Sequence, residues 1–277
     1  MVKIITDSSS LYTKKEADEM GIVVHPLMVT VADKEYRDYE EIDTLTFCNI
    51  VREGNIPKSS QPPMGEIVAS FEDAPGEVLD ITIADGLSGT YQSAESAKDV
   101  AENADKVTVY NTRTICGPQR YLVEVAVNLS KEGKNASEIV EELESRVQKC
   151  CSFLIPNDFD FLKRGGRLTP LAAIIGGFLK IVPVMIHSED GTRLEKFQVS
   201  RTMKDAFNSI VNYFKEAGVN EDYKIFVSHA DNLKQATMII NKLEEAFPNN
   251  KIEVLELSPA FATQGGPGCI AVQYIKK

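Results

Sequence analysis

Short β-branched runs alternate with helical segments through the first half of the chain, and this alternation constrains the fold more than any other feature. The runs VKIIT (2–6), EVLDITIA (77–84) and KVTVYN (106–111) are typical of buried strands, and helical patterns fill most of the sequence between them. A strand–helix–strand order requires crossover connections, which are right-handed and produce a mostly parallel sheet. The first half is therefore predicted to form an α/β domain with a Rossmann-like sheet.

The helices of this first half are predicted from apolar periodicity and from the glycines and prolines that bound it. They are expected at 14–21, 42–54, 64–73 and 87–104, with two more between 115 and 149. The run IVVHPLMVTV (22–31) is predicted to be a further strand.

The second half reads as a succession of strands with fewer helices. Strand candidates are 151–156, 181–186, 192–199, 222–229, 251–257 and 269–275. Asp190-Gly191 separates two of them and is a typical hairpin turn, so antiparallel pairing is expected there. We predict two α/β domains, residues 1–151 with a parallel sheet and 152–277 with a mixed or antiparallel sheet, with the ligand between them.

Charge excludes two classes of partner. The chain of 277 residues has a formal net charge of −11. Nucleic acids and anionic membrane surfaces are bound through positive patches, so neither is an expected partner.

The longest apolar stretch is too short to span a membrane. It lies within 170–186 and is interrupted by Lys180 and Pro183, so it is interpreted as a buried helix followed by a strand, without stable membrane insertion. The N-terminus lacks the long apolar region of a signal peptide. The five cysteines show neither a C-x-x-C pair nor metal-ligand spacing, which indicates a reducing cytoplasm and no metal site.

A serine between two glycines, in GLSGT (86–90), follows the strand predicted at 77–84. A hydrolase nucleophile needs the order G-x-S-x-G, but the second glycine comes one position early, and the three histidines lie in no recognisable signature. The same turn offers backbone N–H groups and hydroxyls to an anion at a helix N-terminus. Ser88 is interpreted as part of an anion site or as a simple helix cap, with a serine-dependent lipid or ester hydrolase as the weaker alternative.

A second stretch, PKSSQPPMGE (57–66), places the adjacent hydroxyls of Ser59 and Ser60 before a proline turn and a helix. It is either a capped turn or a second part of the same anion site at the carboxyl edge of the sheet. The glycine patterns of dinucleotide and P-loop sites are absent, so no nucleotide cofactor is expected.

Six motifs, taken together and in this order, closely resemble the DegV family over essentially the whole chain. They are TDSSS (6–10), SSQPPMGE (59–66), GLSGTYQSA (86–94), FDFLKRGGRL (159–168), HADN (229–232) and GGPG (265–268). The resemblance implies a carrier, not an enzyme, that buries one long-chain fatty acid between two α/β domains. It also implies a partner: a separate ATP-using subunit of a fatty acid kinase, which phosphorylates the bound acid for phospholipid synthesis.

The resemblance assigns roles to residues within these motifs. The lipid-binding positions are Ser59, Ser60, Ser88, Gly89, Gln264 and Gly266. Arg167 and Arg201 are expected to face the partner or the acyl phosphate. Gln264 stands where the family often has histidine, and Asp85 where serine is common; Asp85 would repel a bound carboxylate unless it is turned away, and the sequence leaves its orientation open. The apolar wall is expected from 170–186, where Ala172, Ala173, Gly176 and Gly177 leave room beside a helix.

Overall fold

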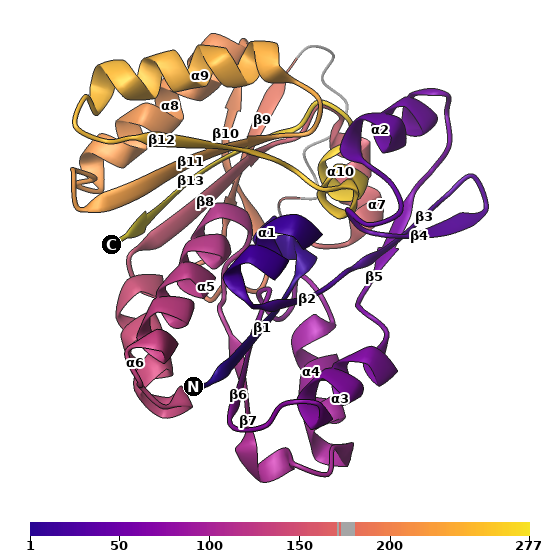
Figure 1. Cartoon of the computed structure of the whole chain (residues 1–277). Coiled ribbons are helices and arrows are strands. Elements are labelled where there is room, and N and C mark those ends of the chain that lie inside the picture. Colours follow the sequence, from indigo (N-terminus) through magenta and orange to yellow (C-terminus); the bar gives the residue numbers. More distant parts are fainter. Residues whose placement is uncertain (171, 173–180) are drawn as a thin grey trace.

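A computed structural model describes residues 1–170, 172 and 181–277. The first half contains the predicted parallel sheet (Figure 1). Its strands, in spatial order, are β2 (Val23–His25), β1 (Lys3–Asp7), β6 (Val78–Thr82) and β7 (Val107–Asn111). All three pairings are parallel, as the alternation of strands and helices predicts.

Helices cover both faces of this sheet, and its strands are therefore buried on both sides. The helices of the first half are α1 (Lys14–Met20), α2 (Thr44–Arg52), α3 (Met64–Glu72), α4 (Thr90–Val100), α5 (Cys116–Lys131) and α6 (Ala136–Val147). Ile5 packs with α3 and α4 on one face, whereas Ile4 packs with α5 and α6 on the other. This alternation along β1 is the period of two that a strand imposes.

A small antiparallel sheet, which the sequence did not indicate, is added to the first half. It consists of β4 (Lys34–Arg37), β3 (Met28–Val31) and β5 (Lys58–Ser60). The single strand predicted at 22–31 was wrong: β2 ends before Pro26 and β3 begins after it. Proline has no N–H for a ladder, so the chain leaves one sheet there and enters another.

The second half forms a mixed sheet of six strands. In spatial order they are β10 (Leu194–Ser200), β9 (Val182–His187), β8 (Cys150–Ile155), β13 (Ile270–Lys276), β11 (Tyr223–His229) and β12 (Ile252–Glu256). Only β11 and β12 pair in parallel. The predicted hairpin at Asp190-Gly191 is confirmed as the β9–β10 connection.

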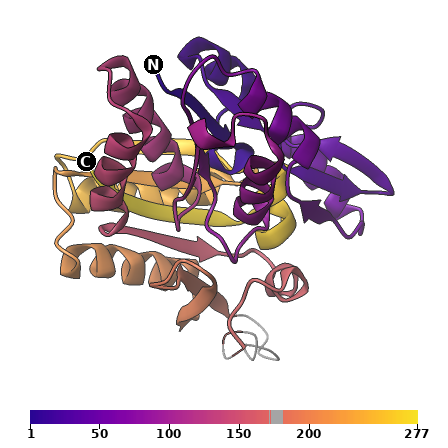
Figure 2. The ribbon, with the colours of Figure 1, turned by 90° about the horizontal axis from the view of Figure 1, so that it is seen from below.

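The remaining described helices belong to the second half of the chain. They are α7 (Phe159–Gly165), α8 (Met203–Glu216), α9 (Leu233–Ala246) and α10 (Pro259–Gly265). α8 and α9 pack against one face of the six-stranded sheet in a shared apolar cluster, and Figure 2 shows α8 on the side away from the first half of the chain. α5 packs against both sheets, since Leu122 shares one apolar cluster with Ile81 of β6 and Phe226 of β11.

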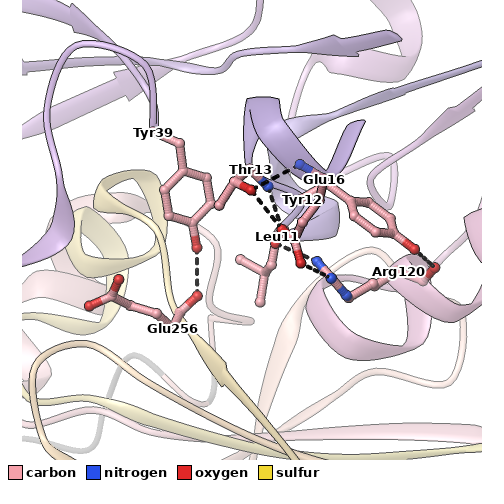
Figure 3. Close-up of polar contacts among 7 residues, drawn as sticks. All are labelled: Leu11, Tyr12, Thr13, Glu16, Tyr39, Arg120 and Glu256. Carbon is pink, nitrogen blue, oxygen red and sulfur yellow. Dashed lines mark hydrogen bonds and ion pairs between the residues drawn. The ribbon is translucent and has the colours of Figure 1, made fainter. Parts of the chain in front are cut away.

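Figure 3 shows two sets of polar contacts, one within the first half and one between the two halves. Arg120 of α5 donates to the carbonyl of Leu11 at 2.7 Å and forms an ion pair with Glu16. Tyr39 donates its hydroxyl to the carbonyl of Glu256, at the end of β12, at 2.5 Å. The first contact fastens the segment after β1 to α5, and the second joins the first half to the second sheet.

Candidate functional site

A cavity lies between the carboxyl end of the parallel sheet and the inner face of the six-stranded sheet. Its apolar walls come from both halves and include Leu27, Ile83, Ile115, Leu154, Leu257 and Ala271. Ile83 follows β6 directly, whereas Leu154 and Ala271 are cross-strand neighbours on β8 and β13. The topology therefore creates a largely apolar space where the two sheets face each other.

Polar side chains and exposed backbone gather at the lining contributed by the two serine motifs. Ser59, Ser60 and Gln61 border the cavity beside Ser88 and Gly89. A Cβ on Gly89 would lie 3.1 Å from Oε1 of Gln61, so the two motifs approach each other closely. Ser59 and Ser60 lie on strand β5, whereas α3 begins only at Met64. Strand pairing with β3, and not a helix N-terminus, holds these hydroxyls in place.

Ser88 is not a simple cap of α4. The helix begins at Thr90, later than the predicted 87, because Gly86 adopts φ +88° and the chain turns before entering the helix. The Ser88 hydroxyl lies 2.8 Å from the hydroxyl of Thr90 and borders the cavity. All three histidines lie in the described part of the chain and none borders this cavity. This arrangement gives Ser88 no general base, and the hydrolase alternative gains no support.

Gln264 connects the two halves at this polar end. It lies on α10, and its Nε2 is 3.1 Å from the hydroxyl of Ser59. Its Oε1 is buried and has no hydrogen-bond partner among the described residues. The amide presses against Gly165, where a Cβ would lie 2.0 Å from Oε1. Glycine at 165 is therefore required for this position of the Gln264 amide.

Two arginines from the second half hold the GLSGT loop by its carbonyl groups. Arg167 borders the cavity, and its Nε donates to the carbonyl of Leu87 at 3.0 Å. Arg193 donates to the carbonyl of Gly86. Burial, and secondarily the charge of Arg193, lower the pKa of Arg167 from its usual value. Arg167 thus brings positive charge to the polar end.

Asp85 is turned into its own loop. Its carboxylate accepts hydrogen bonds from the N–H of Gly86 and from Nε2 of Gln92, both at 3.0 Å. It does not border the cavity. The sequence left the orientation of Asp85 open. In the structure, its carboxylate faces its own loop and helix α4.

Two of the predicted site residues do not border the cavity. Gly266 has φ +77° after α10, and a Cβ there would lie 3.0 Å from the ring of Phe161. Arg201 is exposed between β10 and α8. The remaining predicted positions, Ser59, Ser60, Ser88, Gly89, Gln264 and Arg167, all border it.

The predicted apolar wall at 170–186 falls largely outside the described residues, which omit 171 and 173–180 and therefore Ala173, Gly176 and Gly177. Ala172 is buried in a cluster with Leu162 and Met185.

Two residues at or near the site gave no signal in the sequence. Arg193, which holds Gly86 but does not border the cavity, sits in an ordinary hairpin, and Ser152, which borders the cavity, sits in the middle of a strand. Alternation along 150–155 predicts that Ser152 and Leu154 share a face, but not that this face borders a cavity.

The described part of the chain contains no group of three or more His, Cys, Asp or Glu side chains that would hold a metal ion. No described helix has both the length and the apolarity needed to cross a membrane.

Comparison with known proteins gives one consistent result. The sequence model of the DegV family matches residues 1–277. A DegV domain-containing protein of Halalkalibacterium halodurans is 31% identical over 283 residues, covering 100% of this chain and 99% of that protein.

Solved structures agree with this match. A DegV family protein from Thermus thermophilus, described as binding fatty acid, superposes with a TM-score of 0.89 at 28% identity, covering 100% of this chain and 99% of that one. DegV from Bacillus subtilis, described as a fatty acid binding protein, superposes with a TM-score of 0.87 at 27% identity and the same coverage. Match and superposition both extend over the whole sequence, and the chain belongs to the DegV family.

Proposed function

We propose that the chain binds one long-chain fatty acid in the cavity between its two halves. The observation that carries this proposal is a largely apolar cavity with a cluster of neutral hydrogen-bonding groups at one part of its lining. Ser59, Ser60, Ser88, Gly89 and Gln264 surround the carboxylate, and the acyl chain lies along the apolar walls. The relatives from Thermus thermophilus and Bacillus subtilis, which share the fold over the whole chain, are described as fatty acid binders.

Burial of the acyl chain supplies most of the affinity. A chain of about 15 methylenes gains roughly 0.8 kcal/mol for each one buried, or on the order of 12 kcal/mol in all. The loss of conformational and overall motion of the ligand on binding offsets a large share of this free energy. The remainder corresponds to nanomolar to micromolar binding, without any strong ion pair at the head group.

The polar end suits a carboxylate because it can present donors. A hydroxyl can donate or accept, so Ser59 tolerates either orientation of the Gln264 amide. With the amide turned over, Oε1 accepts from Ser59 and Nε2 is free to donate to the carboxylate. Arg167 already uses Nε on the carbonyl of Leu87 and Nη1 on that of Gly165, so it cannot offer the carboxylate a side-on fork through Nε.

We further propose that the chain is a carrier without turnover of its own, which presents the carboxylate to an ATP-dependent fatty acid kinase subunit. Neutral donors orient the head group and leave an oxygen able to attack ATP, whereas a bidentate arginine would restrain both oxygens. Arg167, and the exposed Lys163 and Arg164 before it, provide positive charge near this end in an acidic chain. Such charge favours an acyl phosphate over a fatty acid.

Titration of delipidated protein with hexadecanoic acid tests the binding proposal. Ser88→Ala is expected to weaken binding by about 0.5–3 kcal/mol, a range that spans neutral hydrogen bonds and those to a charged acceptor. Ser96→Ala is the matched control, because Ser96 lies on the exposed side of α4, the helix that follows Ser88, and its hydroxyl donates to the carbonyl of Gln92. Equal affinity of Ser88→Ala and Ser96→Ala would remove Ser88 from the site.

The carrier proposal has a separate test. Wild-type protein loaded with hexadecanoic acid is expected to yield acyl phosphate only when ATP and the kinase subunit from the same cell are both present. Binding without any transfer in the complete mixture would contradict the presenting role and leave the binding proposal intact. Ester hydrolysis by the isolated chain would contradict the assignment as a carrier.

A further inference from the structure

One polar side chain interrupts the apolar wall that the six-stranded sheet contributes to the cavity. Ser152 of β8 borders the cavity and is 4% exposed. Its neighbours along the same wall are apolar: Leu154 lies two residues further along β8, and Ala271 lies opposite Leu154 on β13. A hydroxyl among these side chains needs hydrogen-bond partners because water is largely excluded there.

Among the described residues the Ser152 hydroxyl has one hydrogen-bond partner, Gln273, which lies opposite it on β13. The Gln273 Nε2 donates to the Ser152 hydroxyl at 2.7 Å and to the carbonyl of Ile115 at 3.0 Å. Its Oε1 accepts from the backbone N–H of Gly117 at 3.2 Å.

These backbone partners fix the orientation of the Gln273 amide. A backbone N–H only donates and a carbonyl only accepts, so turning the amide over would oppose two donors at Gly117 and two acceptors at Ile115. Unlike that of Gln264, the amide of Gln273 therefore has one permitted orientation. Nε2 faces Ser152, and Ser152 must act as the acceptor.

The hydroxyl proton of Ser152 consequently has to find an acceptor elsewhere. No described residue accepts it: the only hydrogen bond of this hydroxyl is the one from Gln273. The free direction is toward the cavity that Ser152 borders. A saturated acyl chain in the cavity would leave this donor unpaired and exclude the water that could pair with it.

We propose that the cavity takes acyl chains with a hydrogen-bond acceptor partway along them, that is, hydroxy or oxo fatty acids, and that Ser152 donates to this oxygen. The inference rests on the proposed binding of a fatty acid and adds the chemical class of its chain. The oxygen must lie at the one chain position that passes Ser152. An oxygen at any other position meets apolar wall and loses its hydrogen bonds to water.

A series of monohydroxy octadecanoic acids tests the proposal on wild-type protein. The hydroxyl is moved stepwise from the carboxyl end to the methyl end, and each acid is titrated against delipidated protein beside unsubstituted octadecanoic acid. We expect one position, or two adjacent ones, to bind about fivefold more tightly than octadecanoic acid, which is roughly 1 kcal/mol. All other positions should bind more weakly. Affinity that is reduced at every position would overturn the proposal.

The Ser152→Ala variant provides a second, independent test of the proposal. The preferred hydroxy acid should lose its advantage in this variant, and octadecanoic acid should bind at least as tightly as it binds wild type, because no buried donor is then left unpaired. Ser228→Ala is the matched control, because Ser228 is also a buried strand serine but does not border the cavity. An advantage that persists in Ser152→Ala would contradict the role of Ser152. Failure of wild-type protein to bind octadecanoic acid itself would instead contradict the proposed function.

Discussion

A single methyl group at position 165 is expected to disable the polar end of the cavity without removing any of its hydrogen-bonding atoms. In Gly165→Ala the new Cβ would lie 2.0 Å from Oε1 of Gln264 and 3.2 Å from its Cδ. Contacts this short do not persist, so the amide of Gln264 must turn away and lose its 3.1 Å contact with Ser59. The amide is the far end of a flexible side chain, and α10 need not move.

The size of the effect follows from the interactions that are lost. Losing a hydrogen bond to a charged group costs about 1.5–3 kcal/mol, so the affinity for hexadecanoic acid should fall by about 10- to 150-fold. Folding stability should change by less, within about 1 kcal/mol, because the Gln264 Oε1 has no partner to lose among the described residues.

Calorimetric titration of four proteins isolates the mechanism: wild type, Gly165→Ala, Gln264→Ala and the double variant. If the methyl group acts only by displacing Gln264, the double variant should bind no more weakly than Gln264→Ala alone. Gly65→Ala serves as the control for a glycine-to-alanine change in a helix, because a Cβ there meets nothing within 4 Å. Wild-type affinity in Gly165→Ala, or fully additive losses in the double variant, would refute this reasoning.

Three further predictions concern residues outside the polar end. Tyr39→Phe removes the hydrogen bond to the carbonyl of Glu256 and should lower the free energy of unfolding by about 1 kcal/mol in urea titrations, with hexadecanoic acid affinity unchanged. Burial, and then the charge of Asp7, raise the pKa of Asp80 to about 8, so wild-type stability should fall as pH rises from about 4 through 8. Asp80→Asn should reduce this dependence in thermal unfolding followed across that range, with the part due to the buried Asp38 and Asp7 remaining, and equal slopes would contradict it. Arg201→Ala should keep hexadecanoic acid affinity within about 0.5 kcal/mol, since Arg201 is exposed and does not border the cavity, yet slow acyl phosphate formation by the kinase subunit; loss of lipid binding instead would contradict its assigned role.

The sequence predicts the elements whose evidence is local. The run at 77–84 contains β6, and the turn at Asp190-Gly191 joins β9 to β10, because burial and turn chemistry act on neighbouring residues. Elements whose secondary structure depends on tertiary pairing could not be predicted from the sequence. Lys58–Ser60 becomes strand β5 only because β3 lies beside it.

The site residues also fall into those with a local sequence signal and those whose role depends on tertiary contacts. Ser59 and Ser88 carry recognisable motifs, and the structure brings both to one cavity. Arg193 and Ser152 carry none, because their importance depends on which surfaces the two halves bring together. Ser152 acquires an unpaired donor only through Gln273, whose amide is oriented by backbone groups at the start of α5.

Mass spectrometry of the freshly purified chain tests the central claim most directly. Spectra recorded under native conditions are expected to show one long-chain fatty acid per chain, and denaturing conditions should release the free acid with no covalent adduct. Ser59→Ala and Ser88→Ala combined should carry less of it. A chain that purifies empty and takes up no hexadecanoic acid on titration would contradict the account.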